Sequence, residues 1–157
     1  MMVTVEIEDE YRRHVGALAH YASVLVGPDD AMDVVNDAVA NTLARGSLVD
    51  VVDVRAYWFQ AVTNTASSWH RSRTRRTARE QRVGTLRPAG REANMDIEES
   101  LMALARLTVQ QRAVVYFAYW QDWPVERIAA VLGVGTGTVR KQLGRARAHL
   151  REVLTNE

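Results

Sequence analysis

Basic residues recur along the stretch 133–147, GVGTGTVRKQLGRAR, which contains no acidic residue. Guanidinium and ammonium groups pair with phosphate oxygens, and arginine can also donate two hydrogen bonds to the edge of a guanine. Lys141 and Arg145 are four residues apart, so they share one face of a helix. We expect this face to meet base edges in the major groove of a duplex, with Arg140 and Arg147 beside it on phosphates.

Two elements must position these basic residues. The stretch VERIAAVLG (125–133) predicts a short helix closed at Gly133, where a positive φ allows a tight turn. A longer helix is expected at about 136–154, which gives the helix-turn-helix layout. Gly135 and Gly137 lack Cβ atoms near its start, so backbone amides there can approach a phosphate closely. The alternative is a solvated basic helix in an ordinary bundle, but the short helix and glycine turn favour DNA binding.

A second group of functional residue types lies in the stretch 54–76, VRAYWFQAVTNTASSWHRSRTRR. Aromatic rings can stack on unpaired bases, amides can read base edges, and arginines can hold the sugar-phosphate backbone. The same rings can also pack into a core, so the residues alone leave both interpretations open. The side chains concerned are Tyr57, Trp58, Phe59, Thr63, Asn64, Ser67, Ser68 and Trp69.

The formal net charge of +1 hides an uneven distribution of charge. The chain is acidic before Arg55, and basic runs follow at 71–91 and 140–151. This layout predicts different partners for different surfaces, with a polyanion facing the basic ones. Asp33 and Asp37, four residues apart on one predicted helix, could dock on a basic partner, and solvated carboxylates are the alternative.

The composition argues against an enzyme. Cysteine is absent and the four histidines have no metal-ligand spacing, so neither a metal nor another cofactor is expected. No phosphate-loop lysine motif or dinucleotide-binding glycine motif occurs. No stretch approaches the roughly 20 apolar residues of a membrane span, and the acidic N-terminus is unlike a signal peptide. We therefore expect a cytoplasmic protein.

Apolar residues recur at helical spacing, which predicts an all-α protein. The stretch 83–96 contains glycine and proline without an apolar period, so it predicts a flexible linker. Two small helical domains result, at 1–82 and 96–157, with the linker at 83–95. Further helices are expected at about 29–45, from Val54 to about 76, at 97–107 and at 109–121.

Caps and turns set the expected ends of these helices. Asp29 and Asp30 offer capping carboxylates to the helix that buries Ala31, Val35, Ala38, Val39, Thr42 and Leu43. Asp96 and Thr108 can cap the next two helices, and Pro124 suits the first position of the short helix.

These stretches together resemble the extracytoplasmic-function (group IV) sigma factors of the sigma-70 family of bacterial RNA polymerase. GPDDAMDVVNDAVANTLAR (27–45) is similar to region 2.2, and the stretch 54–76 is similar to regions 2.3 and 2.4. Residues 107–154 are similar to region 4, and GTVRKQLGRAR (137–147) is the most specific part. The resemblance covers nearly the whole chain and implies a region 2 bundle joined to a region 4 helix-turn-helix.

The resemblance implies a sigma factor that binds core RNA polymerase, directs it to promoter DNA and melts the −10 element, with an anti-sigma factor as a further partner. The implied polymerase-binding residues are Asp33, Asn36, Asp37 and Val39. Those implied for the −10 element are Asn64, Ser68, Arg71 and Arg73. At the −35 element, Lys141 and Arg145 would meet bases, and Gly137, Thr138, Arg140 and Arg147 would meet phosphates.

Some positions depart from the family pattern. They affect which side chains assist melting of the −10 element and which −35 sequence is read. Leu43 and Tyr57 stand where tryptophan is common, and Gln60, Thr63 and Gln142 stand where arginine is common. Two other functions stay open. A helix-turn-helix regulator that binds duplex DNA alone would leave the acidic and aromatic helices unexplained. A sigma-like protein that sequesters a partner without initiating transcription would be consistent with the departures in the melting helix.

Overall fold

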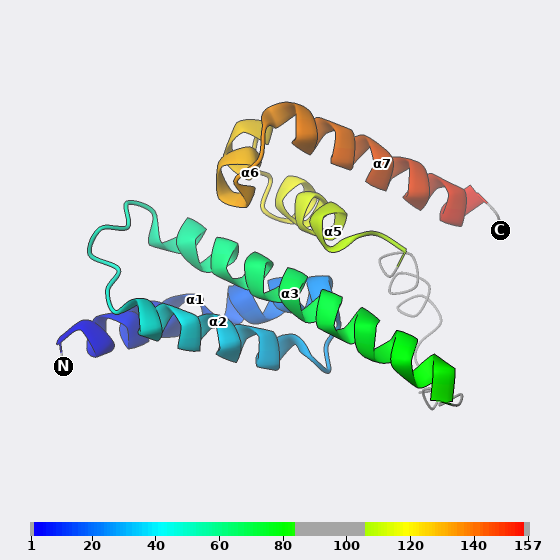
Figure 1. Cartoon of the computed structure of the whole chain (residues 1–157). Coiled ribbons are helices and arrows are strands. Elements are labelled where there is room, and N and C mark those ends of the chain that lie inside the picture. Colours follow the sequence, from blue (N-terminus) through cyan, green and yellow to red (C-terminus); the bar gives the residue numbers. More distant parts are fainter. Residues whose placement is uncertain (1, 84–105, 156–157) are drawn as a thin grey trace.

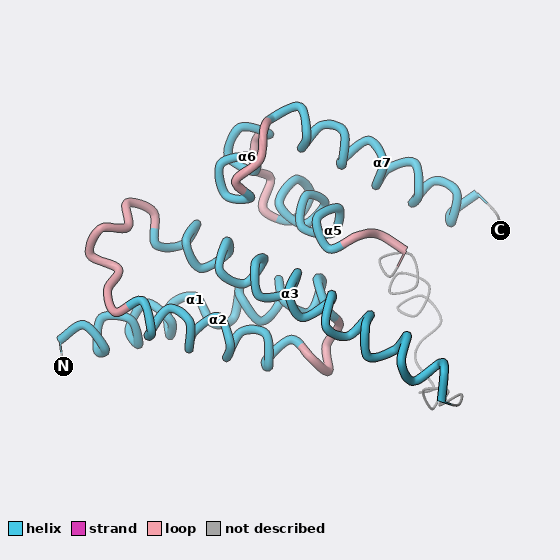
Figure 2. The backbone as a smooth tube through the Cα atoms, in the orientation of Figure 1, coloured by secondary structure: helices cyan, strands magenta, loops and turns pink. Residues whose placement is uncertain are grey.

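The computed structural model describes residues 2–83 and 106–155, and every regular element in these two stretches is helical (Figures 1 and 2). The N-terminal half (2–83) contains α1 (Met2–Val26), α2 (Ala31–Arg45) and α3 (Val54–Val83). The C-terminal half (106–155) contains α5 (Val109–Val115), the π-helical turn η1 (Tyr116–Trp120), α6 (Val125–Leu132) and α7 (Thr136–Thr155). The all-α prediction is confirmed.

The first three helices form a bundle because each has an apolar stripe at helical spacing. Leu18 and Leu25 of α1 are buried, as are Val34 of α2 and Trp58 and Val62 of α3. Full burial of a leucine or valine side chain contributes about 1.5–3 kcal/mol, so this stripe is the main stabilising feature of the bundle. Among the helices described, none combines the length and the apolar character that a membrane crossing needs.

The start of α2 differs from the prediction. Asp30 occupies the N-cap position, but its side chain makes no capping hydrogen bond. Its carboxylate instead accepts a hydrogen bond from Nη1 of Arg73 on α3, at 2.6 Å. A charged donor outcompetes a backbone amide, which explains why the capping prediction is wrong for Asp30. Leu43 was expected in the core but is 44% exposed, because Ala38 and Thr42 define the inward face of this helix.

Helix α3 begins at Val54, as predicted, and continues to Val83, the first residue of the predicted linker. The rest of that linker and the helix expected at 97–107 with its Asp96 cap lie outside the described residues.

Helix α5 begins with a capping box. The Thr108 side chain accepts a hydrogen bond from the amide of Gln111, and the Gln111 side chain accepts one from the amide of Thr108. This confirms the predicted cap. The single helix expected at 109–121 becomes π-helical after Val115, where the amide of Gln121 bonds to the carbonyl of Tyr116.

Helices α6 and α7 form the predicted helix-turn-helix. Gly133 closes α6 with a φ of 67°, a left-handed conformation that favours glycine. Pro124 precedes the first turn of α6 as its N-cap, one residue earlier than predicted. Ile128 of α6 and Val139 and Ala146 of α7 are buried between the helices, so the basic residues of α7 face outward.

The two halves pack against each other in this structure, with α5 and α6 lying over α1 and α3 (Figure 1). Residues of both halves belong to one continuous cluster of buried side chains. Val131 of α6 is buried because α6 packs on α3 as well as on α7. The division into domains at residues 82 and 96 stays a prediction.

Candidate nucleic-acid interface

The outward face of α7 holds all the residues predicted to meet the −35 element. Val139, Leu143 and Ala146 are buried on the opposite face and fix the orientation of the helix. The predicted contacts are all exposed: Gly137, Thr138, Arg140, Lys141, Arg145 and Arg147. The structure therefore brings these residues together on a solvent-facing basic surface.

The cations of this surface differ in what they already contact. Nε of Arg147 donates a hydrogen bond to the Tyr119 hydroxyl at 2.6 Å, and its guanidinium lies 5.7 Å from the centre of that ring. Arg140 lies 4.0 Å from Glu126, and both side chains are mostly exposed, so this ion pair is weak. Lys141 and Arg145 form no ion pair with any residue that the structure describes. They are available for a ligand.

The N-terminal end of α7 is open to solvent. Gly135 and Gly137 are exposed, and a Cβ built on either would meet nothing within 4 Å. The first amides of a helix lack partners within the helix and carry partial positive charge. A phosphate can therefore reach this end from the solvent side without displacing any described side chain.

Gln142 does not lie on the basic face. Its Nε2 donates to Oε1 of Gln110, and its Oε1 accepts from Nε2 of Gln111, both at 3.1 Å. These bonds join α7 to the first turn of α5. The sequence departure at this position therefore serves the packing of α7 on α5.

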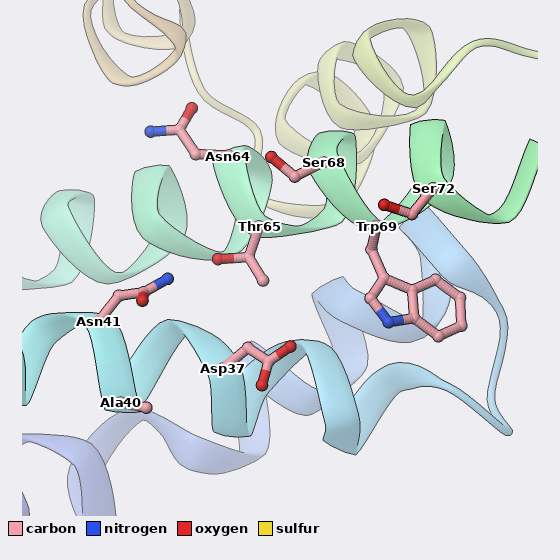
Figure 3. Close-up of a pocket in the computed structure, with 8 residues that line it drawn as sticks. All are labelled: Asp37, Ala40, Asn41, Asn64, Thr65, Ser68, Trp69 and Ser72. Atoms are coloured by element: carbon pink, nitrogen blue, oxygen red, sulfur yellow. The ribbon is translucent and has the colours of Figure 1, made fainter. Parts of the chain in front are cut away.

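A cleft of about 440 Å³ lies between α2 and α3 (Figure 3). Thr65 and Trp69 of α3 point toward α2, whereas Asn64 points away from α2 and Ser68 lies at the upper edge of α3 in this view. The lining residues are Asp37, Ala40 and Asn41 of α2 and Asn64, Thr65, Ser68, Trp69 and Ser72 of α3. Amide, hydroxyl and carboxylate groups beside an indole ring suit a planar, hydrogen-bonding ligand such as a nucleobase.

The cleft joins residues that the sequence assigned to different partners. Asn64 and Ser68 were predicted to meet the −10 element, whereas Asp37 was predicted to meet the polymerase. The sequence analysis did not identify Asn41 and Thr65 as residues of a site. Asn41 follows Asp37 by four residues and so lies on the same face of α2, which is the signal that could have identified it.

The two arginines predicted for the −10 strand lie beyond the cleft on α3. Arg73 pairs with Asp30 and lies 5.6 Å from the ring centre of Trp69, so it holds the indole in place. Arg71 is exposed, and its Nη2 donates to the Ser68 hydroxyl at 3.4 Å. Burial, Arg112 and Arg73 together lower the pKa of the neighbouring His70.

The predicted polymerase-binding residues lie on α2. Asp33, Asn36 and Asp37 are exposed at spacings of three and four, so they form one outward polar surface. Val39 is half-buried and packs against the core. Among the residues described, no group of three or more acidic or histidine side chains could hold a metal ion.

Two of the departures on α3, Thr63 and Tyr57, make structural contacts. Thr63 is buried, its hydroxyl lies 2.6 Å from that of Tyr21, and it donates to the carbonyl of Phe59. Tyr57 donates to the Thr42 hydroxyl at 3.4 Å. An arginine at position 63 would have to displace the Tyr21 contact, so this departure belongs to the packing of α1 on α3.

Comparisons with known proteins identify relatives along almost the whole chain. Residues 97–150 match the family described as sigma-70, region 4. The chain is 34% identical to the RNA polymerase sigma-E factor of Streptomyces coelicolor over 96% of this chain and 86% of that protein. It is 29% identical to the ECF RNA polymerase sigma factor SigL of Mycobacterium tuberculosis over 92% of this chain and 86% of that protein.

Solved structures show the same fold. The sigma factor RpoE of Bartonella quintana, in complex with the anti-sigma factor NepR, matches with a TM-score of 0.74 and 24% identity over 95% of this chain and 96% of that chain. CnrH in complex with the cytosolic domain of CnrY matches with a TM-score of 0.66 and 24% identity over 96% of this chain and 88% of that chain. The chain belongs to the extracytoplasmic-function group of RNA polymerase sigma factors.

Proposed function

We propose that this chain binds core RNA polymerase and directs it to promoters, where α7 reads the −35 element and the α2–α3 cleft captures the melted −10 strand. The observation that carries the proposal is the presence in one chain of an exposed basic recognition helix and a polar cleft beside an indole ring. Neither feature alone distinguishes an initiation factor from an ordinary duplex-binding protein.

The −35 contacts divide into base contacts and phosphate contacts. Lys141 and Arg145 are exposed and unpaired among the described residues, so both can turn toward base edges. Arg140 and Arg147 have partners at the rim of the same face, which suits them to phosphates that fix the register of the helix. Gly137 and Thr138 would contribute the N-terminal end of α7 to a further phosphate.

The −10 contact would use the α2–α3 cleft. Asn64 would hydrogen-bond to the edge of a flipped base while Trp69 offers a stacking surface. Ser68 and Arg71 would meet the adjacent backbone, and Arg73 would hold Trp69 in position. The cleft lies beside an exposed polar surface of α2, so strand capture and polymerase binding would use adjacent surfaces.

The partners follow from these surfaces. Asp33, Asn36 and Asp37 would dock on a basic surface of the core polymerase, with Val39 at the edge of the contact. RpoE was solved with a bound anti-sigma factor. An anti-sigma factor is accordingly proposed for this chain. We place the protein in the cytoplasm with its polymerase, assign RNA synthesis to the polymerase, and assign no cofactor to the chain.

Run-off transcription with purified core polymerase on a pool of genomic promoters tests the proposal. The chain should produce defined start sites that core polymerase alone does not produce. No start site on any template would contradict the proposal. Tight, sequence-specific footprinting without polymerase would instead favour a helix-turn-helix regulator.

A further inference from the structure

Tyr119, on the π-helical turn η1, contacts the basic surface of α7 from outside that helix. Nε of Arg147 donates a hydrogen bond to the Tyr119 hydroxyl at 2.6 Å, and the guanidinium lies 5.7 Å from the centre of the tyrosine ring. The two residues are 28 positions apart in the sequence. Because both contacts act on one guanidinium, they limit the directions in which Arg147 can point.

The π-helical turn presents Tyr119 to the solvent. Tyr116 and Phe117 are buried, and a regular α-helix would bring Trp120 to the same inward face. Trp120 is instead 66% exposed, and Tyr119 is 58% exposed. The amide of Gln121 bonds to the carbonyl of Tyr116, which widens the turn and changes the register of the residues within it. Tyr119 is therefore an exposed ring on a turn that the buried rings before it hold in place.

The bond to Tyr119 uses one edge of the Arg147 guanidinium and leaves the other available. Arginine carries N–H groups on Nε and on both terminal nitrogens, and Tyr119 engages Nε. The terminal nitrogens of Arg147 bond to no residue that the structure describes. They can therefore donate a parallel pair of hydrogen bonds to the oxygens of a phosphate while Nε stays bonded to the tyrosine.

The partner of Arg147 is neutral, whereas the partner of Arg140 is acidic. Glu126 lies 4.0 Å from Arg140 and would compete with a phosphate for that cation. A tyrosine hydroxyl accepts the Nε–H without neutralising the charge, so Arg147 keeps its whole attraction for an anion. A side chain that is fixed before binding also loses less rotamer entropy when it contacts a phosphate.

We propose that Tyr119 is a positioning residue for the −35 complex, whose hydroxyl holds the Arg147 guanidinium in the orientation that binds a DNA phosphate. The inference rests on the phosphate contact proposed above for Arg147. It extends the DNA-binding apparatus from α6 and α7 to the π-helical turn that precedes them. Since Tyr119 acts through Arg147, its hydroxyl matters only while the guanidinium is present.

Tyr119→Phe tests the inference because it removes the hydroxyl and retains the ring. The complex of this variant with core polymerase should bind promoter DNA about three- to tenfold more weakly, by a similar factor at every −35 sequence. The slope of the logarithm of the binding constant against the logarithm of the salt concentration should stay unchanged, because Arg147 keeps its charge. Arg147→Ala should reduce that slope by about one. Tyr11→Phe, which removes a hydroxyl from α1, is the matched control and should bind as the natural chain does.

A double-mutant cycle separates positioning from an independent effect of the hydroxyl. In the Arg147→Ala background, Tyr119→Phe should change promoter binding by less than about twofold. An equal loss in both backgrounds would overturn the inference, because the hydroxyl would then act without Arg147. Unchanged binding by Tyr119→Phe in the natural background would overturn it as well. Failure of the proposed function looks different, because the natural chain and polymerase would then form no promoter complex.

A second measurement needs neither polymerase nor DNA. Hydrogen exchange at Nε of Arg147, followed by NMR in the free chain, should be slowed by the bond to the Tyr119 hydroxyl. Tyr119→Phe should accelerate this exchange about fivefold, the factor that corresponds to the loss of an ordinary hydrogen bond. Exchange at Nε of Arg145, which bonds to no described residue, is the internal control and should not change. Equal exchange at Arg147 in both chains would overturn the inference, because the hydroxyl would then not hold the guanidinium.

Discussion

The hydroxyl groups of Tyr21 on α1 and Thr63 on α3 lie 2.6 Å apart in the interior of the protein. Thr63 also donates to the carbonyl of Phe59, so Tyr21 is the donor in the bond between the two hydroxyls. Burial raises the pKa of the Tyr21 hydroxyl above its ordinary value, and the bond to Thr63 offsets this only in part. The side chain at position 63, which departs from the family pattern, thereby joins α1 to α3 beside the buried rings of Tyr21 and Phe59.

Tyr21→Phe should lower the free energy of unfolding by about 1 kcal/mol, because a buried hydrogen bond is lost with little change in shape. Urea denaturation at neutral pH measures the change. Tyr119→Phe is the matched control, since its hydroxyl bonds to Arg147 on an exposed surface and its loss should cost less than about 0.5 kcal/mol. Equal losses of unfolding free energy in both variants would show that the buried Tyr21–Thr63 bond stabilises the fold no more than the exposed bond between Tyr119 and Arg147 does.

Acid should weaken the fold through His70. Burial, followed by the nearby Arg112 and Arg73, lowers the pKa of this imidazole below its ordinary value of 6.5. The unfolded chain therefore binds the proton at a higher pH than the folded chain, so stability falls as the pH drops below about 6.5. His70→Gln should flatten this part of the curve of unfolding free energy against pH. Identical curves for His70→Gln and the natural chain would refute the assignment.

Base and phosphate contacts on α7 should respond differently to mutation. Arg145→Ala should cost about 1–3 kcal/mol at the preferred promoter and relax the choice of −35 sequence. Arg140→Ala should weaken binding by a similar factor at every promoter sequence. It should also reduce the slope of the logarithm of the binding constant against the logarithm of the salt concentration by about one. Competition binding of the polymerase complex to promoters with altered −35 elements, at several salt concentrations, separates the two. If the two variants showed the same dependence on −35 sequence and on salt concentration, the division into a base contact and a phosphate contact would be contradicted.

Asn64→Ala should impair promoter melting more than polymerase binding, because Asn64 lines the α2–α3 cleft while the acidic surface of α2 stays intact. A fluorescent base analogue in the −10 element reports melting, and a pull-down of core polymerase reports binding. Thr74→Ala, at an exposed position of the same helix outside the cleft, is the control. Normal melting by Asn64→Ala would remove this residue from the site.

Local sequence signals predicted much of this architecture. Apolar spacing located α2, α3, α6 and α7, the glycine at 133 located the turn, and Thr108 located the start of α5. These features depend on residues within a few positions of one another, so a short window of sequence contains the necessary information.

Contacts between distant residues could not be predicted in this way. Asp30 is 43 positions from Arg73, and Arg112 is 87 positions from Leu25. Each pairing depends on how whole helices dock, which periodicity does not specify. The same reason explains the contacts of Phe117 with Tyr21 and Phe59, since a ring that fills the interior of one half looks the same in sequence as a ring that joins the two halves.

Complex formation with core RNA polymerase tests the central proposal most directly. The purified chain, free of any inhibitor, should co-elute with bacterial core enzyme at modest ionic strength and should give that enzyme promoter-dependent initiation. Asp33→Ala combined with Asp37→Ala should weaken the complex, because both carboxylates lie on the exposed surface of α2. If the chain and the core enzyme elute separately at every ratio tested, the assignment of this chain as an initiation factor is wrong.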